Sequence, residues 1–396
     1  MYDFDSLPDR RGTASLKWDF GGRIAGREGL LPLWVADMDF AAPAFIAEAM
    51  AGRAAHGVFG YTLEPESYFE AAMRWLSTRH GWDVKREWLL PAPGVVQTLS
   101  AALLAASGPG ERIVIQPPVY HPFALRIRAN GRAVAENPLV LDGDRYRMDF
   151  EGLERVLAGG ARMLMLCSPH NPGGRAWTRE ELGRAAGLCS RHGAVIVSDE
   201  IHADLVLPGR RHASIASVSD EAARITVTCV SATKTFNLAG LGGSLAIVAD
   251  DGLRKRLRAA LEAQCGGTAN CFAVAAAEAA WRHGSAWLDE LIAYVAGNLS
   301  YLRDRLSTEL PRARVLPLEA TYLAWIDLSR LGLSDDETRN RLLDAGVWLD
   351  EGRKFGRGGE GFQRLNLACP RPVLSRAVDA MVRALGPRPG SPPARS

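Results

Sequence analysis

The sequence predicts an α/β fold in which a mostly parallel sheet is covered by helices on both faces. Three observations predict it. Apolar runs with the composition of buried strands occur at 112–116, 162–167, 194–198 and 225–230. Helical patterns separate these runs, as expected where crossover helices join parallel strands. Polar residues follow the end of each run, and ligands of such folds bind at the carboxyl ends of the strands.

The first hundred residues predict an irregular arm followed by helices. Residues 1–45 place apolar anchors and carboxylates without a regular period. A helix is expected to open at Pro43, because proline is tolerated in a first turn, and a second one over 66–79, where apolar residues recur at helical spacing. The turn 93–96 leads into a helical run at 99–106. A turn that opens a helix presents free N–H groups to a phosphate, which is a weak signal on its own.

The rest of the chain predicts further helices and a second, smaller α/β unit. Thr178 and Glu181 form the pattern of a capping box for a helix that reaches about Arg191. The later elements are expected as helices at 273–281, at 287–306 and from about Ser375, strands at 322–327 and 363–368, and a Gly-rich loop at 356–361. The predicted domains are an N-terminal arm that also contributes to the small domain (1–45), a large domain (46–285), a small C-terminal domain (286–386) and a disordered tail (387–396).

Composition places the chain among ordinary globular proteins. Its 396 residues are 47% hydrophobic and 23% charged, which is enough chain for two domains. A formal net charge of +2 gives no electrostatic case for binding nucleic acid or a membrane surface. No signal peptide or bilayer-spanning run is recognised, so a cytoplasmic location is expected. The cysteines form no C-x-x-C pair, and His170 and His202 lack partners at ligand spacing, so neither disulfides nor a metal site is expected.

Lys234 follows the apolar run 225–230 and is expected on the loop just past the end of that strand. The chain has five lysines against forty-two arginines, so a lysine beside a core strand is not explained by generic surface charge. An amine among small hydroxyl residues, here Ser231 and Thr233, can form a Schiff base with a carbonyl cofactor, while the hydroxyls and backbone N–H groups hold an anion. A solvated lysine that caps the next turn is the alternative for this stretch alone.

Three more residues of distinct chemistry follow strand ends, namely Tyr120, Asn171 and Asp199. A cofactor that joins an amine through an aldehyde and stores electrons in a protonated pyridine needs a lysine and a carboxylate. An aromatic ring over the pyridine, a donor for its phenolate oxygen and a helix N-terminus for its phosphate complete the set. Pyridoxal 5'-phosphate requires all of these groups. Lys234, the three strand-end residues and the turn 94–96 can supply them.

On these residues the chain resembles the fold-type-I aminotransferase superfamily. The order that carries the resemblance is Asn171, Asp199-Glu200-Ile201-His202, Ser231-x-Thr233-Lys234 and Arg364. Within the superfamily, the chain is similar to the cystathionine β-lyase (C–S lyase) branch from about residue 12 to 385. The motifs of this closer resemblance are WVADMDF (34–40), FGYT (59–62), PVYHPF (118–123), SPHNP (168–172) and RLNLACP (364–370). Each motif is modestly specific, but a chance match of so many in order is improbable.

The resemblance implies chemical roles for the residues around the cofactor ring. Lys234 would hold the cofactor and later move the proton, and Asp199 would pair with the pyridinium nitrogen. Tyr120 would stack on the ring. Asn171, together with His202, would face the phenolate oxygen. Each role has a structural alternative: Asp199 as a helix N-cap, Tyr120 as a core aromatic and His202 as a histidine satisfied in a loop.

The resemblance also implies how the phosphate, the substrate and a second subunit are held. The phosphate ligands would be Val95, Val96, Ser231 and Thr233. Arg364 would bind the substrate carboxylate through its planar fork, with a surface arginine as the alternative. Tyr61 would reach the phosphate of the neighbouring subunit's cofactor, which implies a homodimer with shared active sites. Gly242 lies where many aminotransferases have a phosphate-binding arginine, eight residues after the lysine, and the lyase branch shares this absence.

The function implied by the resemblance is β-elimination from an L-cysteine S-conjugate such as cystathionine, giving a thiol, pyruvate and ammonia. An aminotransferase would use the same residues. A decarboxylating or oxidative reaction on a bulky cysteine conjugate in a biosynthetic pathway is also open. A regulatory protein that only binds the cofactor is a fourth possibility, but intact Lys234, Asp199 and Arg364 argue against it as the sole role, since binding alone needs no base.

Overall fold

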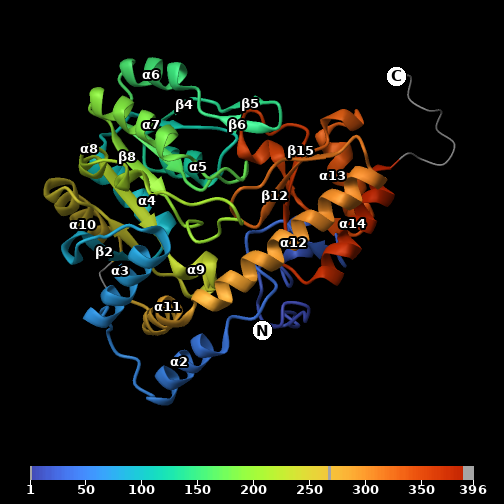
Figure 1. Ribbon diagram of the computed structural model, residues 1–396, viewed down its shortest axis with the longest axis horizontal. Coiled ribbons are helices and arrows are strands. Elements are labelled where there is room, and N and C mark those ends of the chain that lie inside the picture. Colours follow the sequence, from blue (N-terminus) through green and yellow to red (C-terminus); the bar gives the residue numbers. More distant parts are fainter. Residues whose placement is uncertain (1, 266–268, 387–396) are drawn as a thin grey trace.

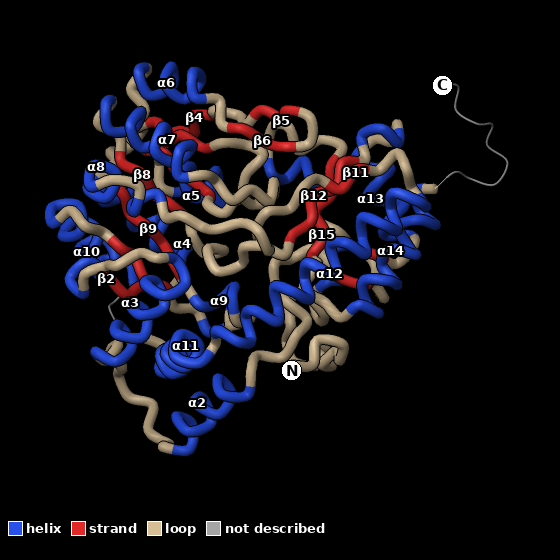
Figure 2. The backbone as a smooth tube through the Cα atoms, viewed as in Figure 1, coloured by secondary structure: helices blue, strands red, loops and turns tan. Residues whose placement is uncertain are grey.

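The computed structural model describes residues 2–265 and 269–386, and its largest element is a seven-stranded sheet (Figures 1 and 2). In spatial order the strands are β2 (Leu89–Ala92), β10 (Ser244–Ile247), β9 (Thr226–Val230), β8 (Val195–Asp199), β7 (Met163–Cys167), β3 (Arg112–Ile115) and β4 (Ala133–Glu136). β10 is antiparallel to both of its neighbours, and the other pairs are parallel. The predicted mostly parallel sheet is confirmed, and the four predicted strands lie within one residue of their expected bounds.

Helices cover both faces of this sheet because side chains of its buried strands alternate between them. Ile113 and Met165 pack with the helices α4 (Val95–Ala106), α5 (Pro122–Ala129) and α10 (Asp251–Cys265) on one face. Val114 and Leu164 pack with α6 (Phe150–Ala158), α7 (Arg179–Arg191) and α8 (Asp220–Arg224) on the other. The predicted capping box of α7 is confirmed.

A second, antiparallel sheet forms the C-terminal part of the chain. Its strands, in spatial order, are β11 (Arg314–Val315), β12 (Leu323–Asp327), β15 (Phe362–Asn366) and β14 (Asp350–Glu351). The associated helices are α12 (Ser285–Glu309), α13 (Asp335–Asp344) and α14 (Arg371–Leu385). α14 begins four residues before the predicted Ser375, because Pro372 fits the first turn of a helix. In Figure 1, α12 extends from the neighbourhood of α9 and α11 to α14.

The N-terminal arm crosses to the C-terminal part of the chain, where it takes part in a separate two-stranded sheet. Its strand β1 (Leu31–Pro32) pairs in parallel with β13 (Val347–Trp348). The remaining helices and strands are α1 (Gly21–Ala25), α2 (Ala44–Ala55), α3 (Glu66–His80), α9 (Ala232–Thr235), α11 (Cys271–His283), β5 (Val140–Asp142) and β6 (Arg145–Arg147). Within the described ranges, no helix combines the length and apolar character needed to cross a bilayer. The predicted tail 387–396 lies outside the described residues, and the division into domains stays a prediction.

Candidate active site

The topology of the large sheet brings the four strand-end residues to one edge. β9, β8, β7 and β3 are consecutive neighbours and run parallel, so their carboxyl ends lie side by side. Lys234 follows β9, Asp199 ends β8, Asn171 follows β7 and Tyr120 follows β3. Arg364 reaches the same place from β15 of the second sheet, where its guanidinium donates from Nη1 to Asn171 Oδ1 at 2.9 Å. The candidate site therefore lies between the two sheets.

Lys234 lies in the one-turn helix α9 and not on a loop, which corrects the expectation from sequence. Ser231 caps this helix, because its Oγ accepts from the backbone N–H of Thr233 at 3.1 Å. The Lys234 ammonium donates from Nζ to the carbonyl oxygen of Ala36, in the N-terminal arm, at 2.6 Å. Burial lowers the pKa of Lys234 to about 8, although the nearby Asp37 carboxylate raises it. A neutral amine is therefore available near neutral pH.

Asp199 is a buried carboxylate that no Lys or Arg of the described chain pairs within ion-pair distance. Its Oδ1 accepts from the backbone N–H of Ile201 at 3.2 Å, and only a turn follows, so it does not cap a helix in the described structure. Burial raises the pKa of Asp199 to about 6. A cation brought to this carboxylate would remove an unfavourable interaction, because burying an unpaired charge is costly.

Arg364 is 4% exposed, so the surface alternative is wrong. Its Nη2 donates to the carbonyl oxygen of Trp34 at 2.8 Å and to Asp350 Oδ2 at 2.7 Å, while Phe355 packs under the guanidinium. Its Nε is buried without a partner in the described chain. The guanidinium is thus held in one orientation and retains a donor for a ligand carboxylate.

Tyr120 and His202 flank the site with different degrees of burial. Tyr120 is half-buried, and burial together with the charge of Asp199 raises its pKa to about 12, so the phenol stays neutral. The His202 ring lies edge-on to Tyr322, with the ring centroids 5.9 Å apart. Burial and the positive charge of Lys234 lower the pKa of His202 to about 3. Its Nδ1 is buried and has no partner in the described chain, which fits a ligand atom at that position.

A cradle for an anion lies where α4 and α9 begin. The N-cap of α4 is Gly94, which has no side chain to bond the first-turn N–H groups of Val95 and Val96. The Ser231 hydroxyl donates to the carbonyl oxygen of Gly243 at 2.7 Å and lies 2.8 Å from Thr233 Oγ1. These hydroxyls and N–H groups suit a phosphate.

Gly242 shows why an arginine is absent beside this cradle. Its φ of +73° is strained for any residue with a side chain, and an added Cβ would lie 2.8 Å from the carbonyl oxygen of Pro93. The backbone path therefore excludes the arginine that many aminotransferases carry at this position.

The predicted residues fit pyridoxal 5'-phosphate, with one exception in this chain. The buried carboxylate of Asp199 fits the pyridine nitrogen, and Lys234, with its lowered pKa, fits the aldehyde. The His202 Nδ1, which has no partner in the described chain, fits the phenolate oxygen, and the anion cradle fits the phosphate. Tyr61 lies apart from them: it is 98% exposed, on the segment between α2 and α3.

Three partners of the site residues, one carboxylate and two backbone carbonyl oxygens, were not predicted from the sequence. Asp350 lies directly opposite Arg364 in the antiparallel pair of β14 and β15. The carbonyl oxygens of Trp34 and Ala36 accept from Arg364 and Lys234. Strand register would have identified Asp350, but β14 is only two residues long and gives no strand signal. Backbone carbonyls carry no sequence signal at all.

Comparisons with known proteins show the family to which the chain is similar. A family model for class I and II aminotransferases matches residues 30–381. The chain is 46% identical over 385 residues to the cystathionine β-lyase PatB of Bacillus subtilis, covering 97% of this chain and 100% of PatB. Cystalysin from Treponema denticola, solved with pyridoxal 5'-phosphate, matches with a TM-score of 0.94 at 32% identity and covers 97% and 99% of the two chains. A pyridoxal phosphate-bound C–S lyase from Staphylococcus hominis matches with a TM-score of 0.91 at 30% identity, covering 98% and 99%.

Proposed function

The chain belongs to the class I and II aminotransferase family, and on that basis we propose that it is a pyridoxal 5'-phosphate-dependent carbon–sulfur β-lyase. Its substrates are L-cysteine S-conjugates of the cystathionine type, which it cleaves to a thiol, pyruvate and ammonia. The observation that carries the proposal is the convergence of Lys234, Asp199 and the Asn171–Arg364 pair at one sheet edge. The relatives named as cystathionine β-lyase and C–S lyase support the choice of reaction.

Arg364 binds and orients the substrate. The α-carboxylate of an amino acid accepts from the guanidinium, whose Nε has no partner in the described chain. Asn171 and the carbonyl oxygen of Trp34 fix the plane of the guanidinium at 2.9 and 2.8 Å. The carboxylate is therefore held in one orientation, so that the Cα–H bond is directed toward Lys234.

Lys234 is the base for the chemical step. When bound, pyridoxal phosphate withdraws electrons from the Cα of an amino acid joined to it and so makes the Cα proton acidic. Lys234 takes this proton with its neutral amine, and the lowered pKa keeps roughly a tenth of the amine neutral at pH 7. The electron pair of the broken Cα–H bond then expels the thiolate from Cβ. The product left behind, aminoacrylate, reacts with water to give pyruvate and ammonia.

Asp199 keeps the pyridine nitrogen protonated, as the removal of the Cα proton requires. An ionised carboxylate 5% exposed to solvent stabilises a proton on the pyridine nitrogen, because the low dielectric strengthens the interaction. Tyr120, which follows β3 at the same sheet edge, would stack its aromatic ring on the pyridine. Together these residues favour carbanion chemistry at Cα.

The test is to add L-cystathionine to the purified protein with bound cofactor and no keto acid, and to assay pyruvate and free thiol. We expect both products in equal amounts. Lys234→Ala should abolish them, while Lys255→Ala, at an exposed position of α10, should not. Amino transfer that appears only with an added keto acid, without pyruvate release, would favour an aminotransferase and would overturn the lyase assignment.

We further propose that the protein acts as a homodimer in which Tyr61 of one subunit completes the site of the other. Val58, Phe59, Tyr61 and Leu63 are large apolar residues exposed by 58 to 98% on one short segment. Four exposed large apolar side chains within six residues are unusual for a free surface and are typical of an interface. The segment is held in place by a hydrogen bond from the backbone N–H of Ala269 to the carbonyl oxygen of Thr62 at 2.9 Å.

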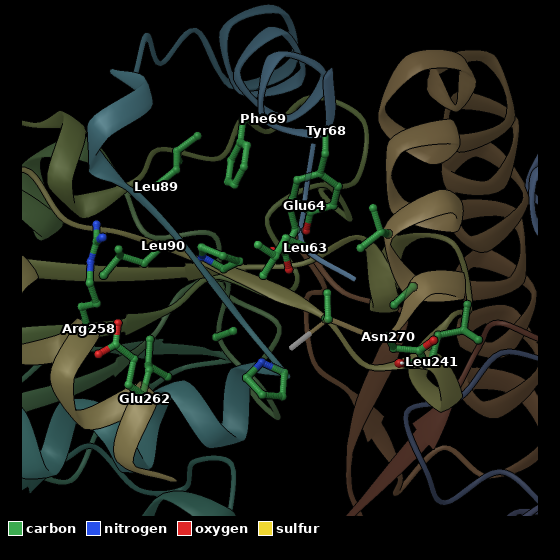
Figure 3. A pocket seen from close by; sticks show the side chains of 18 of the residues that line it. Leu63, Glu64, Tyr68, Phe69, Leu89, Leu90, Leu241, Arg258, Glu262 and Asn270 are labelled. Carbon is green, nitrogen blue, oxygen red and sulfur yellow. Dashed lines mark hydrogen bonds between the residues drawn. The ribbon is translucent and has the colours of Figure 1, made fainter. Parts of the chain in front are cut away.

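A cavity of about 670 Å³ lies next to this segment and supports the same proposal. Figure 3 shows Tyr68 and Phe69 of α3 at one side of the cavity, with Leu63 and Glu64 between them and Leu241. Its lining reaches Pro93 and Gly243, which adjoin the anion cradle. A partner segment that enters this cavity would therefore arrive beside the cofactor phosphate, where a phenol can donate a hydrogen bond.

A further inference from the structure

Asp204 is a buried carboxylate outside the site described above, in the segment that follows β8. Its side chain is 8% exposed. Its Oδ1 accepts from Trp75 Nε1 at 2.8 Å and lies 2.7 Å from His80 Nε2. Its Oδ2 accepts from the hydroxyl of Thr235 at 2.7 Å. Both carboxylate oxygens therefore have partners. Trp75 and His80 belong to α3 and Thr235 belongs to α9, so the carboxylate joins these two helices to the segment after β8.

This arrangement keeps Asp204 ionised in spite of its burial. Burial raises the pKa of Asp204, but the hydrogen bond and charge of His80 and the bonds from Thr235 and Trp75 outweigh it, and the pKa is lowered. Hydrogen bonds to an ionised acceptor are shorter and stronger than those between neutral groups. The Thr235 hydroxyl is consequently held more firmly than a hydroxyl bonded to a carbonyl oxygen.

Thr235 is the residue that follows Lys234, and α9 needs external support. A helix of one turn has too few internal hydrogen bonds to hold itself. Ser231 holds the start of the helix, because its hydroxyl accepts from the backbone N–H of Thr233 and donates to the carbonyl oxygen of Gly243. The bond from Thr235 to Asp204 fixes its last residue. Lys234 thus lies between two attachments, of which the second depends on the carboxylate.

We propose that Asp204, held by Trp75 and His80, is a positioning residue that fixes the catalytic Lys234 through the hydroxyl of Thr235. The inference rests on the proposed function, in which Lys234 joins the cofactor and moves the Cα proton. Loss of the attachment lets α9 rotate or shift, and displacing a reacting group by about 1 Å can cost about 100-fold in rate. Substrate binding through Arg364 does not depend on this attachment.

The test compares Thr235→Val, which deletes the hydroxyl at nearly constant volume, with Thr235→Ser, which retains it. Thr226→Val is the matched control. Thr226 lies at the start of β9, far from the site edge, and is as buried as Thr235. Its hydroxyl donates at 2.7 Å to the carbonyl oxygen of Ala222 in α8. Four quantities are measured for each variant: Tm, kcat and KM for L-cystathionine, and the rate at which cofactor-free protein captures pyridoxal phosphate on Lys234. Capture is followed by the visible absorbance band and, after borohydride reduction, by peptide mass.

We expect Thr235→Val to lower kcat and the capture rate by about 10- to 100-fold with KM changed by less than about threefold. Thr235→Ser should restore both, and Thr226→Val should change Tm alone. Equal effects of Thr235→Val and Thr226→Val on kcat and capture would overturn the proposal. If Thr235→Val does not fold, Asp204→Asn tests the same attachment, and unchanged capture in that variant would overturn it.

The wild-type protein and the Thr235→Val variant distinguish a wrong function from a wrong role of Asp204. If the wild-type protein does not capture pyridoxal phosphate on Lys234, the proposed function is wrong. If the wild-type protein captures it and Thr235→Val captures it equally fast, the function stands and the positioning role is wrong.

Discussion

The buried negative charge of Asp199, which its proposed role requires, lowers the stability of the cofactor-free protein. Burial raises its pKa from 3.8 to about 6, so folding favours the protonated form. Such a group contributes its full stability below its unfolded pKa and loses it as pH rises through the folded value. The rise in the pKa of Asp199 from 3.8 to about 6 corresponds to a loss of about 3 kcal/mol of stability at neutral and higher pH. In the proposed function, the pyridinium of pyridoxal 5'-phosphate would be the cation that removes this cost.

Asp199→Asn should therefore stabilise the cofactor-free protein at pH 8, by up to about 3 kcal/mol in the free energy of unfolding. The amide keeps an acceptor for the Ile201 N–H and removes the charge. The gain should shrink as pH falls through 6 toward 4, where the wild-type carboxyl becomes protonated. Urea unfolding of cofactor-free wild type and variant at several pH values measures this gain in stability. The variant should have no activity, because it lacks the carboxylate proposed to pair with the pyridine nitrogen.

Asp327→Asn is the matched control for this prediction. Asp327 is also 5% exposed, but Arg314 pairs with it at 3.1 Å, so neutralising it should destabilise the protein at pH 8. An Asp199→Asn variant that is no more stable than wild type at pH 8, or whose gain is the same at pH 4, would contradict the argument.

The sequence predicts individual site residues where they follow a predicted strand. Lys234, Asp199 and Asn171 follow apolar runs, and the rule that parallel strands end at one edge is enough to bring them together. Asp204 and Asp350 could not be predicted in this way. Their partners come from other elements, at sequence distances that no local pattern reports.

Among the elements, α4 contributes to the site through its backbone. Its first N–H groups have no side-chain cap, and a phosphate at a helix N-terminus accepts from such groups and gains from the helix dipole. Val95 is the first residue of this helix, a position at which proline is tolerated. The contribution of one N–H group can therefore be removed without breaking the helix.

Val95→Pro should weaken the binding of pyridoxal phosphate by about tenfold or more, because one charge-assisted hydrogen bond worth about 1.5–3 kcal/mol is lost. Val95→Ala is the control, since it reduces the same buried side chain and keeps the N–H group. Absorbance titration of the cofactor-free variants gives the dissociation constants. Equal affinity of the two variants would exclude a contribution from this N–H group.

The elements that sequence reasoning missed are short or unusual. β2, β4 and β10 contain at most one β-branched residue each, whereas the equally short β3 contains Ile113, Val114 and Ile115, so only β3 of these four has the composition of a buried strand. β10 is antiparallel in a parallel sheet, which no local signal indicates. The long helices α11 and α12 were predicted because their apolar periodicity extends over several turns.

α3 reaches from the proposed subunit interface to the attachment of Lys234. Tyr68 and Phe69, near its beginning, line the cavity proposed to receive a partner subunit. Trp75 and His80, in its later turns, bond Asp204. The same rigid helix therefore contacts the proposed interface and the attachment of Lys234.

Complementation between two inactive chains tests whether the active sites are shared. Tyr61→Ala should lose cofactor affinity and activity, and Lys234→Ala should lose activity entirely. In a mixed dimer, one site combines an intact Lys234 with the partner subunit's Tyr61, while the other site lacks both. After equal amounts are mixed and reassociated, half of the dimers are mixed, so about a quarter of wild-type activity should return.

The control is a mixture of Lys234→Ala and Asp199→Ala, whose residues serve the same site within one chain, so neither site of a mixed dimer is intact and no activity should return. Mass spectrometry of intact complexes measures the fraction of mixed dimers in both experiments. Recovery in the first mixture alone requires Tyr61 to act across the interface, since no other pairing restores a complete site. Mixed dimers that form without recovery would place the function of Tyr61 within its own chain and refute the shared site.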